Sequence, residues 1–304
     1  MIKALHSKGG AAGLSVGSNA TLILLKLIVG IMTGSVSVIS EAIHSSIDLL
    51  AALIALFSVQ VSDLPPDDDH PYGHGKIENI SGTVEAFLIF AAALYIVYEA
   101  VEKILNGVTL EHLGLGAGIM AFSAVANTFV SRHLSHVACE KDSIALEADA
   151  WHLYTDIFTS VGVFAGLAVV WLTGWTILDP IIAIGVALFI CKAAWDLTRR
   201  SSAGLLDTKL PQEEEGKVRE VLKGHYGLFV DFHGLRSRKA GSRRHVDLHL
   251  VMDGNKNVAE AHQICDHLEE EIESELPNTD VTIHVEPLSA NGADGGQDTT
   301  QLLD

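Results

Sequence analysis

Two stretches of this chain decide its fold: residues 37–53 read SVISEAIHSSIDLLAAL, and residues 146–163 read LEADAWHLYTDIFTSVGV. Both are mostly apolar, and each contains a histidine followed four residues later by an aspartate. The pairs are His44 with Asp48 and His152 with Asp156. Residues four apart in an α-helix lie about 40° apart around the axis and about 6 Å along it, so the members of a pair face the same way. We therefore expect two helices that each present one imidazole and one carboxylate on a single face.

Long apolar runs recur through the N-terminal part of the chain. Hydrophobic residues make up 48% of its 304 residues and the mean hydropathy is +0.31, which is unusual for a soluble domain. A helix needs roughly 20 apolar residues to cross the hydrocarbon core of a membrane. Six runs reach that length: residues 11–33, 36–60, 80–105, 112–131, 143–172 and 176–198. The sequence thus predicts an α-helical membrane domain of six transmembrane helices over residues 1–206.

Ionisable residues inside such helices need an explanation, because each costs roughly 2.5 to 3.5 kcal/mol at the centre of a membrane helix. A lone histidine or aspartate could simply hydrogen-bond to a neighbouring helix. Two identical pairs instead indicate a shared site, in which two imidazoles and two carboxylates surround a divalent metal ion tetrahedrally. These ligands contain no sulfur and bind metal only when deprotonated, so they can release the ion in exchange for protons. We expect this site at His44, Asp48, His152 and Asp156.

The C-terminal part has a different character from about Asp207 onward, with charges spaced along the chain and no run of spanning length. An amphipathic helix with an acidic first turn is predicted for LPQEEEGKVREVLKGH. Two alternating strands, a second helix and a third strand follow. The order αββαβ predicts a small α+β domain of ferredoxin-like type over residues 207–288. Residues 289–304 are expected to be a disordered tail.

Charge limits the partners and sets the orientation. The net charge of −18 argues against nucleic acid, because phosphate binding needs a basic surface. Basic residues near the ends of the predicted helices fall mainly on one side, as is typical of the cytoplasmic side of a membrane. That side has Lys3, Lys8, Lys76, Arg132, Lys141, Arg199 and Arg200, and the other has Lys103. Both termini are therefore expected in the cytoplasm.

Residues 62–79, SDLPPDDDHPYGHGKIEN, connect the second and third predicted helices. The two prolines stop a helix and the glycines allow tight turns, so a compact loop is expected. Asp67, His70 and His74 are spaced three and four apart and could bind one metal ion from a short segment of chain. A solvated acidic loop that only separates the helices is the alternative.

Together these motifs resemble the cation diffusion facilitators, and most closely the YiiP-type bacterial zinc/proton antiporters. The similarity rests on the six membrane helices, the paired motifs in the second and fifth, the loop signature D-x-x-H-P-Y-G-H-G-K at residues 67–76 and the small C-terminal domain. It covers about residues 8–288 and implies a multi-pass homodimer in the lipid bilayer of the cell inner membrane. Such a protein is a secondary transporter rather than an enzyme; it exports Zn²⁺ from the cytoplasm in exchange for protons and also binds Zn²⁺ as a regulator.

The same resemblance assigns the metal ligands. His44, Asp48, His152 and Asp156 correspond to the transport site, and Asp67, His70 and His74 to a loop site. The corresponding residues of the cytoplasmic metal-binding dimerisation domain are His233, His249, His262, His284 and Glu286. Glu286 stands where relatives usually have aspartate. His245 and His267 have no counterpart in the family, and we expect them at the surface.

One departure from the family bears on the choice of metal. Many bacterial members have aspartate at the position of His44, and a second imidazole favours Zn²⁺ over Mn²⁺ and Cd²⁺. Export of Fe²⁺, Mn²⁺ or Cd²⁺ stays an alternative, as does a membrane metal sensor that signals through its cytoplasmic domain. The sequence lacks the G-x-x-x-x-G-K-[ST] motif of an ATP-driven pump, and neither histidine pair contains the glutamate of a metallohydrolase H-E-x-x-H motif.

Overall fold

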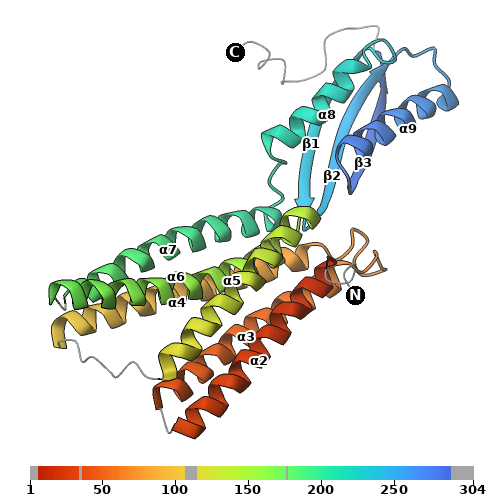
Figure 1. Cartoon of the computed structure of the whole chain (residues 1–304). Helices are drawn as coiled ribbons and strands as arrows, with labels where there is room; N and C mark the ends of the chain where they lie inside the picture. The colour runs from red at the N-terminus through yellow and green to blue at the C-terminus, as the bar shows by residue number, and fades with distance from the viewer. Residues whose placement is uncertain (1–5, 34–35, 107–114, 176, 289–304) are drawn as a thin grey trace. The chain divides into compact units, whose positions relative to one another are not determined.

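The computed structural model of the chain consists of two compact units, Met1–Leu205 and Leu206–Asp304 (Figure 1). The residues it describes are 6–33, 36–106, 115–175 and 177–288. The predicted tail, residues 289–304, and the side chain of His44 lie outside this described part. Each unit has a hydrophobic core of its own.

Within the described residues, six long helices make up the N-terminal unit. They are α2 (Lys8–Thr33), α3 (Val36–Ser62), α4 (Lys76–Asn106), α5 (Leu115–Lys141), α6 (Ile144–Thr173) and α7 (Leu178–Leu205). Successive helices run in opposite directions, so α2, α4 and α6 start at the end of the unit where α3, α5 and α7 finish (Figure 1). α2 packs beside α3, and α4 packs beside α7. The helices lie where the sequence predicts them, although α5 continues past its predicted end at residue 131.

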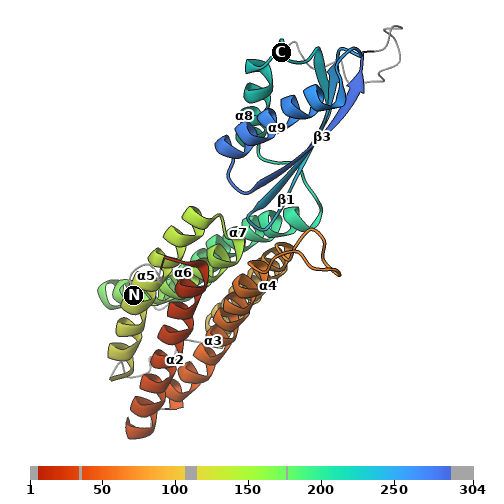
Figure 2. The same cartoon turned by 90° about the vertical axis from the view of Figure 1, so that its right-hand side faces the viewer.

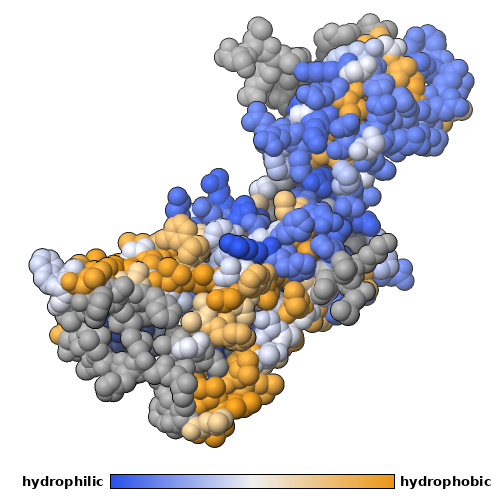
Figure 3. Space-filling model, in the orientation of Figure 1, coloured by the Kyte–Doolittle hydropathy of each residue, from blue (hydrophilic) through white to orange (hydrophobic). Residues whose placement is uncertain are grey.

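The surface of this unit is apolar where that of a soluble protein would be polar. Large side chains such as Leu24, Ile31 and Trp195 are exposed, Ile31 by as much as 73%. Figure 3 shows hydrophobic surface spread over these helices. Lipid tails are as apolar as such side chains, so a membrane covers this surface without the penalty that water would impose.

By length and composition, four segments of the described part could each cross a membrane. They are Lys8–Met32, Ser45–Ser62, Lys76–Leu105 and Leu178–Leu205, which belong to α2, α3, α4 and α7. α5 ends in a polar stretch that includes Arg132, His133 and His136, and α6 contains Glu147 and Asp149. The sequence predicts that α5 and α6 cross the membrane as well.

α4 and α7 approach closely because glycines line their contact. A Cβ atom on Gly82 of α4 would lie 2.7 Å from Ser201 Oγ of α7, and one on Gly204 of α7 would collide with the side chain of Asn79. Asn79 Nδ2 also donates a hydrogen bond to the Ser201 carbonyl oxygen at 3.1 Å. Small residues and interhelical hydrogen bonds are the usual means of holding membrane helices together. These contacts tie the first turns of α4 to the last turns of α7.

A buried ionic network joins helices at one end of the unit. Lys8 Nζ of α2 lies 2.7 Å from Glu78 Oε1 of α4, and Ser62 Oγ of α3 donates to the same oxygen at 2.8 Å. Ser143 Oγ, just before α6, donates to Glu78 Oε2 at 2.5 Å. Burial of a carboxylate is costly unless it is both paired and hydrogen-bonded. Glu78, which is 0% exposed, meets both conditions.

The described residues of the C-terminal unit form two helices and three strands. These are α8 (Gln212–Gly224), β1 (Asp231–Ala240), β2 (Arg243–Met252), α9 (Val258–Glu275) and β3 (Thr279–Pro287). β2 is the central strand, antiparallel to β1 and parallel to β3. Figure 2 shows α8 and α9 on one side of the sheet. The predicted α+β fold with the order αββαβ is confirmed.

Alternation along β2 decides which face of the sheet carries the core. Val246, Leu248 and Leu250 are buried together with Leu222 of α8 and Leu268 of α9. Successive side chains of a strand point to opposite faces. The odd-numbered residues of β2, such as His249, therefore lie on the face away from the helices.

Candidate metal centres

The buried centre lies between α3 and α6 of the N-terminal unit. Asp48 comes from α3, and His152 and Asp156 come from successive turns of α6. His152 Nε2 lies 3.1 Å from Asp48 Oδ1, and one ligand atom from each of the three residues lies within 4.8 Å of the others. Asp48 is 6% exposed and His152 is 7% exposed, so helices enclose the cluster. The structure brings these three predicted residues together; the side chain of His44, on α3, is outside its described part.

Ligand spacing in the buried centre suits a small divalent cation. Zn–N and Zn–O bonds are about 2.0 to 2.2 Å long, so ligand atoms around a tetrahedral ion lie about 3.4 Å apart. The 3.1 Å between His152 Nε2 and Asp48 Oδ1 is close to that value. Two carboxylates beside one imidazole also place negative charge in a buried position, where cations or protons have to balance it.

A buried lysine lies against the same stretch of α3. Lys26 Nζ of α2 donates a hydrogen bond to Ser45 Oγ at 2.7 Å, and both side chains are buried. Ser45 precedes Asp48 by three residues, so the ammonium group approaches α3 one turn before the aspartate. Lys26 is not among the site residues that the sequence patterns predict. A lysine inside a predicted span is nevertheless a signal of function, because a charge is costly there.

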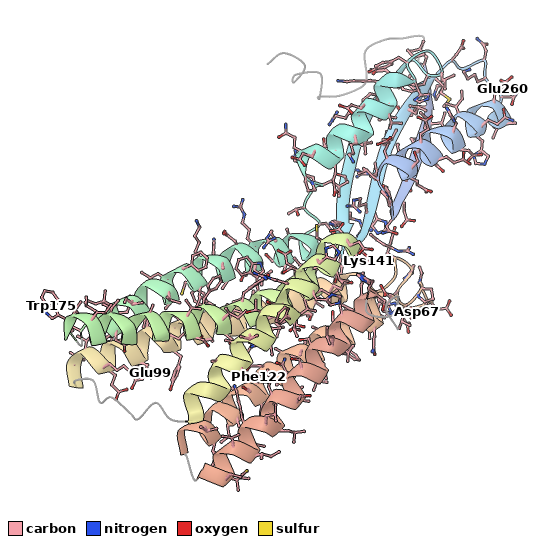
Figure 4. The ribbon with its side chains drawn as sticks, viewed as in Figure 1. Asp67, Glu99, Phe122, Lys141, Trp175 and Glu260 are labelled. Atoms are coloured by element: carbon pink, nitrogen blue, oxygen red, sulfur yellow. The ribbon has the colours of Figure 1, made fainter. Side chains whose placement is uncertain are left out.

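The loop centre lies between α3 and α4, at the position labelled Asp67 in Figure 4. Asp67 Oδ1 accepts the backbone N–H of His70 at 2.6 Å and lies 3.1 Å from His70 Nδ1; Asp67 Oδ2 lies 3.4 Å from His74 Nε2. One ligand atom from each residue lies within 4.8 Å of the others. The hydrogen bond from the His70 N–H lowers the pKa of Asp67, so this carboxylate is ionised and able to bind a cation. All three predicted loop residues therefore lie together.

The third centre lies across the open face of the C-terminal sheet. His233 of β1 pairs with His249 of β2, which pairs with His284 of β3, so three histidines lie side by side on adjacent strands. Glu286 follows His284 by two residues and shares its face. His249 Nδ1 lies 2.8 Å from Glu286 Oε1, and His233 Nε2 lies 3.5 Å from Glu286 Oε2. The glutamate therefore reaches both rings.

A β-bulge shapes this centre. The register of β1 shifts between His233 and Arg236, and Gly234 within the shift has φ +62°. Only glycine adopts this left-handed conformation without strain. A Cβ atom at Gly234 would also lie 3.4 Å from Cδ2 of His249, so the bare backbone lets that ring lie against the bulge.

Two predicted ligands of the C-terminal unit are farther from this cluster. His284 lies at its margin, with Nε2 3.9 Å from Glu286 Oε1 and its ring centroid 5.0 Å from that of His249. His262, on α9, is exposed and lies 3.4 Å from Asp266. It lines a groove of about 610 Å³ that Glu286 also lines. The structure thus brings His233, His249 and Glu286 together, but His262 is not part of the cluster.

Two further groups of possible ligand residues are not predicted by the sequence patterns. His6, His136 and Glu140 lie together in the N-terminal unit, and His225, His267 and Glu271 lie together in the C-terminal unit. In each group, two residues are four apart on one helix and the third comes from a distant segment. The four-residue spacing of the helical pair can be recognised in the sequence, but the third residue of each group cannot be predicted from it.

Of the two histidines expected at the surface, His267 is exposed and His245 is not. His245 is 8% exposed, and its Nδ1 lies 3.5 Å from Asp280 Oδ2. The prediction of a surface position for His245 is therefore wrong. β3 covers this part of β2, because Asp280 pairs with His245 in the sheet register.

Two family models match the chain. That of the cation efflux transmembrane domain matches residues 13–206, and that of the cation efflux protein cytoplasmic domain matches residues 210–288. An uncharacterized transporter of Synechocystis sp. is 35% identical over 277 residues, which cover 91% of this chain and 89% of that protein. The cation-efflux pump FieF of Pectobacterium atrosepticum is 32% identical over 269 residues, which cover 88% of this chain and 89% of the pump.

Solved structures of CzrB, described as a candidate zinc transporter, match a smaller part of the chain. One is 40% identical and covers 26% of this chain and 99% of its own, with a TM-score of 0.26. A zinc form is 37% identical and covers 26% of this chain and 90% of its own, with a TM-score of 0.24.

Proposed function

Since this chain belongs to the cation diffusion facilitator family of cation efflux transporters, we propose that it exports Zn²⁺ from the cytoplasm in exchange for protons through the buried centre of α3 and α6. The observation that carries the proposal is the enclosed cluster of Asp48, His152 and Asp156, with His152 Nε2 3.1 Å from Asp48 Oδ1. Ionisable groups buried within membrane helices mark ion pathways in transporters.

The chemistry of this cluster supports exchange of metal for protons. Imidazole and carboxylate ligands bind a cation only after losing their protons, so metal and protons compete for the same atoms. In the absence of metal, protons balance the buried negative charge; in its presence, the ion does. Binding from one side and release to the other then couple the two fluxes, provided that the helices alternate between two arrangements.

Zinc is the ion that the donor set supports best. Zn²⁺ accepts nitrogen and oxygen ligands in tetrahedral geometry, whereas Mn²⁺ prefers more oxygen ligands. His44, as the fourth member of the tetrad, would add a second imidazole where many relatives have aspartate.

The remaining proposals concern orientation and assembly. Lys141 and Asp67 lie at one end of the N-terminal unit, and Glu99 and Trp175 lie at the other (Figure 4). α2 and α4 also start at the first end, with Lys8 and Lys76. These basic residues support the proposal that this end of the helices faces the cytoplasm. In the inner membrane, both termini of the chain would then be cytoplasmic.

The match to the family's cytoplasmic domain supports a homodimer with regulatory zinc in the C-terminal unit. The residues that we propose for this site are His233, His249, His284 and Glu286, with His262 as a more distant member. The loop residues Asp67, His70 and His74 are proposed to bind a further ion. Zinc at the regulatory site would favour association of two chains, because a ligand stabilises the state that it binds.

The test is zinc flux in liposomes that contain the purified full-length protein. We expect uptake of Zn²⁺ into liposomes with an acidic lumen, accompanied by a rise in lumenal pH. Asp48→Asn should reduce uptake to the level of protein-free liposomes, whereas Ser46→Ala, on the exposed side of α3, should leave it unchanged.

Each part of the proposal has an outcome that would contradict it. Zinc binding without any flux would indicate a receptor, and flux that ignores the pH gradient would rule out proton antiport. Equal rates for Zn²⁺ and Cd²⁺ would contradict zinc selectivity; His44→Asp should raise the rate for Cd²⁺.

A further inference from the structure

We infer a separate metal site in the C-terminal unit, formed by His225, His267 and Glu271, that binds a divalent cation of the Zn²⁺ or Co²⁺ type. His225 follows the C-terminal end of α8, and His267 and Glu271 lie four residues apart on α9. The site therefore joins two helices. It is independent of the proposed transport function, because none of its residues comes from the N-terminal unit.

The separations of the ligand atoms match those around a tetrahedral ion. His225 Nε2 lies 3.6 Å from Glu271 Oε2, and His267 Nε2 lies 3.9 Å from Glu271 Oε1. For bonds of about 2.0 to 2.2 Å, neighbouring ligands of a tetrahedral ion are about 3.4 Å apart. The two rings meet edge to face, with centroids 5.0 Å apart, and one ligand atom from each of the three residues lies within 4.8 Å of the others. Small side-chain rotations suffice to close the site around an ion.

A backbone hydrogen bond prepares His225 for metal binding. Its Nδ1 lies 2.9 Å from the carbonyl oxygen of Val221. A carbonyl oxygen can only accept, so Nδ1 carries the hydrogen and donates it. In the neutral ring Nε2 then has a free lone pair, and Nε2 is the atom that faces Glu271. Metal-binding histidines commonly have this second contact, which fixes both the tautomer and the orientation of the ring.

The charge around the site also suits a cation. α9 contains six glutamates and one aspartate, but no lysine or arginine. Among the described residues, the ion-pair partners of Glu271 are His225 and His267 alone. The carboxylate is thus not already neutralised by a lysine or arginine, and the acidic helix attracts cations to its surface.

This site is distinct from the one on the open face of the sheet. His249 and its partners lie on the face of β2 opposite to Leu248 and Leu250, whereas α8 and α9 pack against the face that those leucines share. The sheet therefore separates the two groups of ligands. Two histidines and one glutamate leave a fourth coordination position for water, a donor set that zinc accepts.

Hydrogen exchange of the full-length protein in detergent tests the site directly. The expected result is that Zn²⁺ at about ten times its dissociation constant slows exchange roughly tenfold in the segments 221–228 and 264–276, because binding stabilises the closed state in proportion to occupancy. Mg²⁺ should have no such effect, since it prefers oxygen ligands. His267→Gln and Glu271→Gln should each abolish the slowing, and Glu270→Gln, an exposed neighbour with the same charge change, should retain it.

Two comparisons make the test decisive. Without zinc, exchange in both segments should be the same in the variants as in the parent protein, which establishes that the variants fold. In a His249→Ala background, zinc should still slow exchange at residues 221–228. Slowing that persists in His267→Gln and Glu271→Gln, or that disappears in His249→Ala, would overturn the inference, whatever the outcome of the transport assay.

Discussion

The two units hold the same kinds of metal-binding side chain in opposite surroundings. In the N-terminal unit, Asp48 and His152 are buried and large apolar side chains are exposed. In the C-terminal unit, Leu248 and Leu250 are buried, and the cluster around Glu286 lies on an open face. Figure 3 shows the corresponding difference in surface hydropathy.

This difference indicates that the exposure of a metal site to solvent determines the role that the site can have. An ion at an open site exchanges with water without any rearrangement, so its occupancy follows the surrounding concentration. An ion at an enclosed site needs protein movement to enter and leave, and the charge that it brings must be balanced within the protein. The first arrangement suits sensing, and the second suits coupled transport.

The largest effect is expected at the enclosed site. His152→Ala removes a buried residue that we propose as a ligand, and loss of even an outer partner of a metal ligand lowers affinity or activity about 10- to 100-fold. We expect zinc flux in liposomes to fall at least about 100-fold. Tyr154→Phe, two residues along α6, serves as the control and should transport normally. Substantial zinc flux in His152→Ala would contradict the proposal that the enclosed site carries transport and the open site does not.

The second effect concerns the polar interior of the N-terminal unit. Glu78→Gln leaves the buried ammonium of Lys8 without its close partner, and breaking a buried ion pair costs about 3 to 5 kcal/mol. We expect a lower midpoint of thermal unfolding, followed by tryptophan fluorescence. All four tryptophans of the chain lie in this unit, so the signal reports on it specifically.

A double variant sharpens that measurement. Lys8→Met combined with Glu78→Gln removes both charges and should recover much of the lost stability, because the cost arises from the unpaired charge. If the double variant were as unstable as the sum of the single variants, the network would not act as an ion pair.

The third effect is expected at the open site. His249→Ala removes the ring that lies 2.8 Å from Glu286, so zinc should bind the C-terminal unit more weakly. We expect the zinc concentration for half-maximal flux to rise several-fold while the maximal flux is retained. The reason is that His249→Ala lowers the zinc occupancy of the proposed regulatory site and leaves the proposed transport site intact. Complete loss of flux would place His249 in the transport path itself.

The smallest effect is a pH dependence of the C-terminal unit. Burial lowers the pKa of His245, and the nearby charge of Arg238 adds to this, while Asp280 opposes it. The unfolded chain then binds more protons than the folded one, so stability is full above about pH 6.5 and decreases as the pH falls below it. Protection factors of the β2 amides, which remove the intrinsic pH dependence of hydrogen exchange, should therefore decrease as the pH is lowered from 7.5 to 5.5, and less so in His245→Gln. An equal decrease in the variant would assign the effect to other groups.

The sequence was most informative where a local pattern determines the structure. Apolar runs located the six helices, alternation located the three strands, and the four-residue spacing of His152 and Asp156 placed them on one face of α6. Hydropathy ended α5 too early because the helix continues through polar residues such as Arg132. A helix is defined by its backbone hydrogen bonds, which do not stop where the apolar surface stops.

The rest depended on contacts between distant segments. His225 lies far from His267 in sequence, and nothing in either segment indicates that the end of α8 meets α9. Lys26 has its partner, Ser45, on another helix. His245 is buried because β3 lies beside β2, a relation that alternation along one strand does not reveal. Pairings of this kind arise from the packing of whole elements.

The network around Glu78 has a consequence for how the protein is made. Lys8 and Glu78 are 70 residues apart, and Ser143 follows Glu78 by a further 65 residues. During synthesis, Lys8 is therefore made well before its partner Glu78. The last hydrogen-bond donor to Glu78, Ser143, is made only when the start of α6 emerges. The complete network can therefore form only after the first four helices have been synthesised and the start of α6 has emerged.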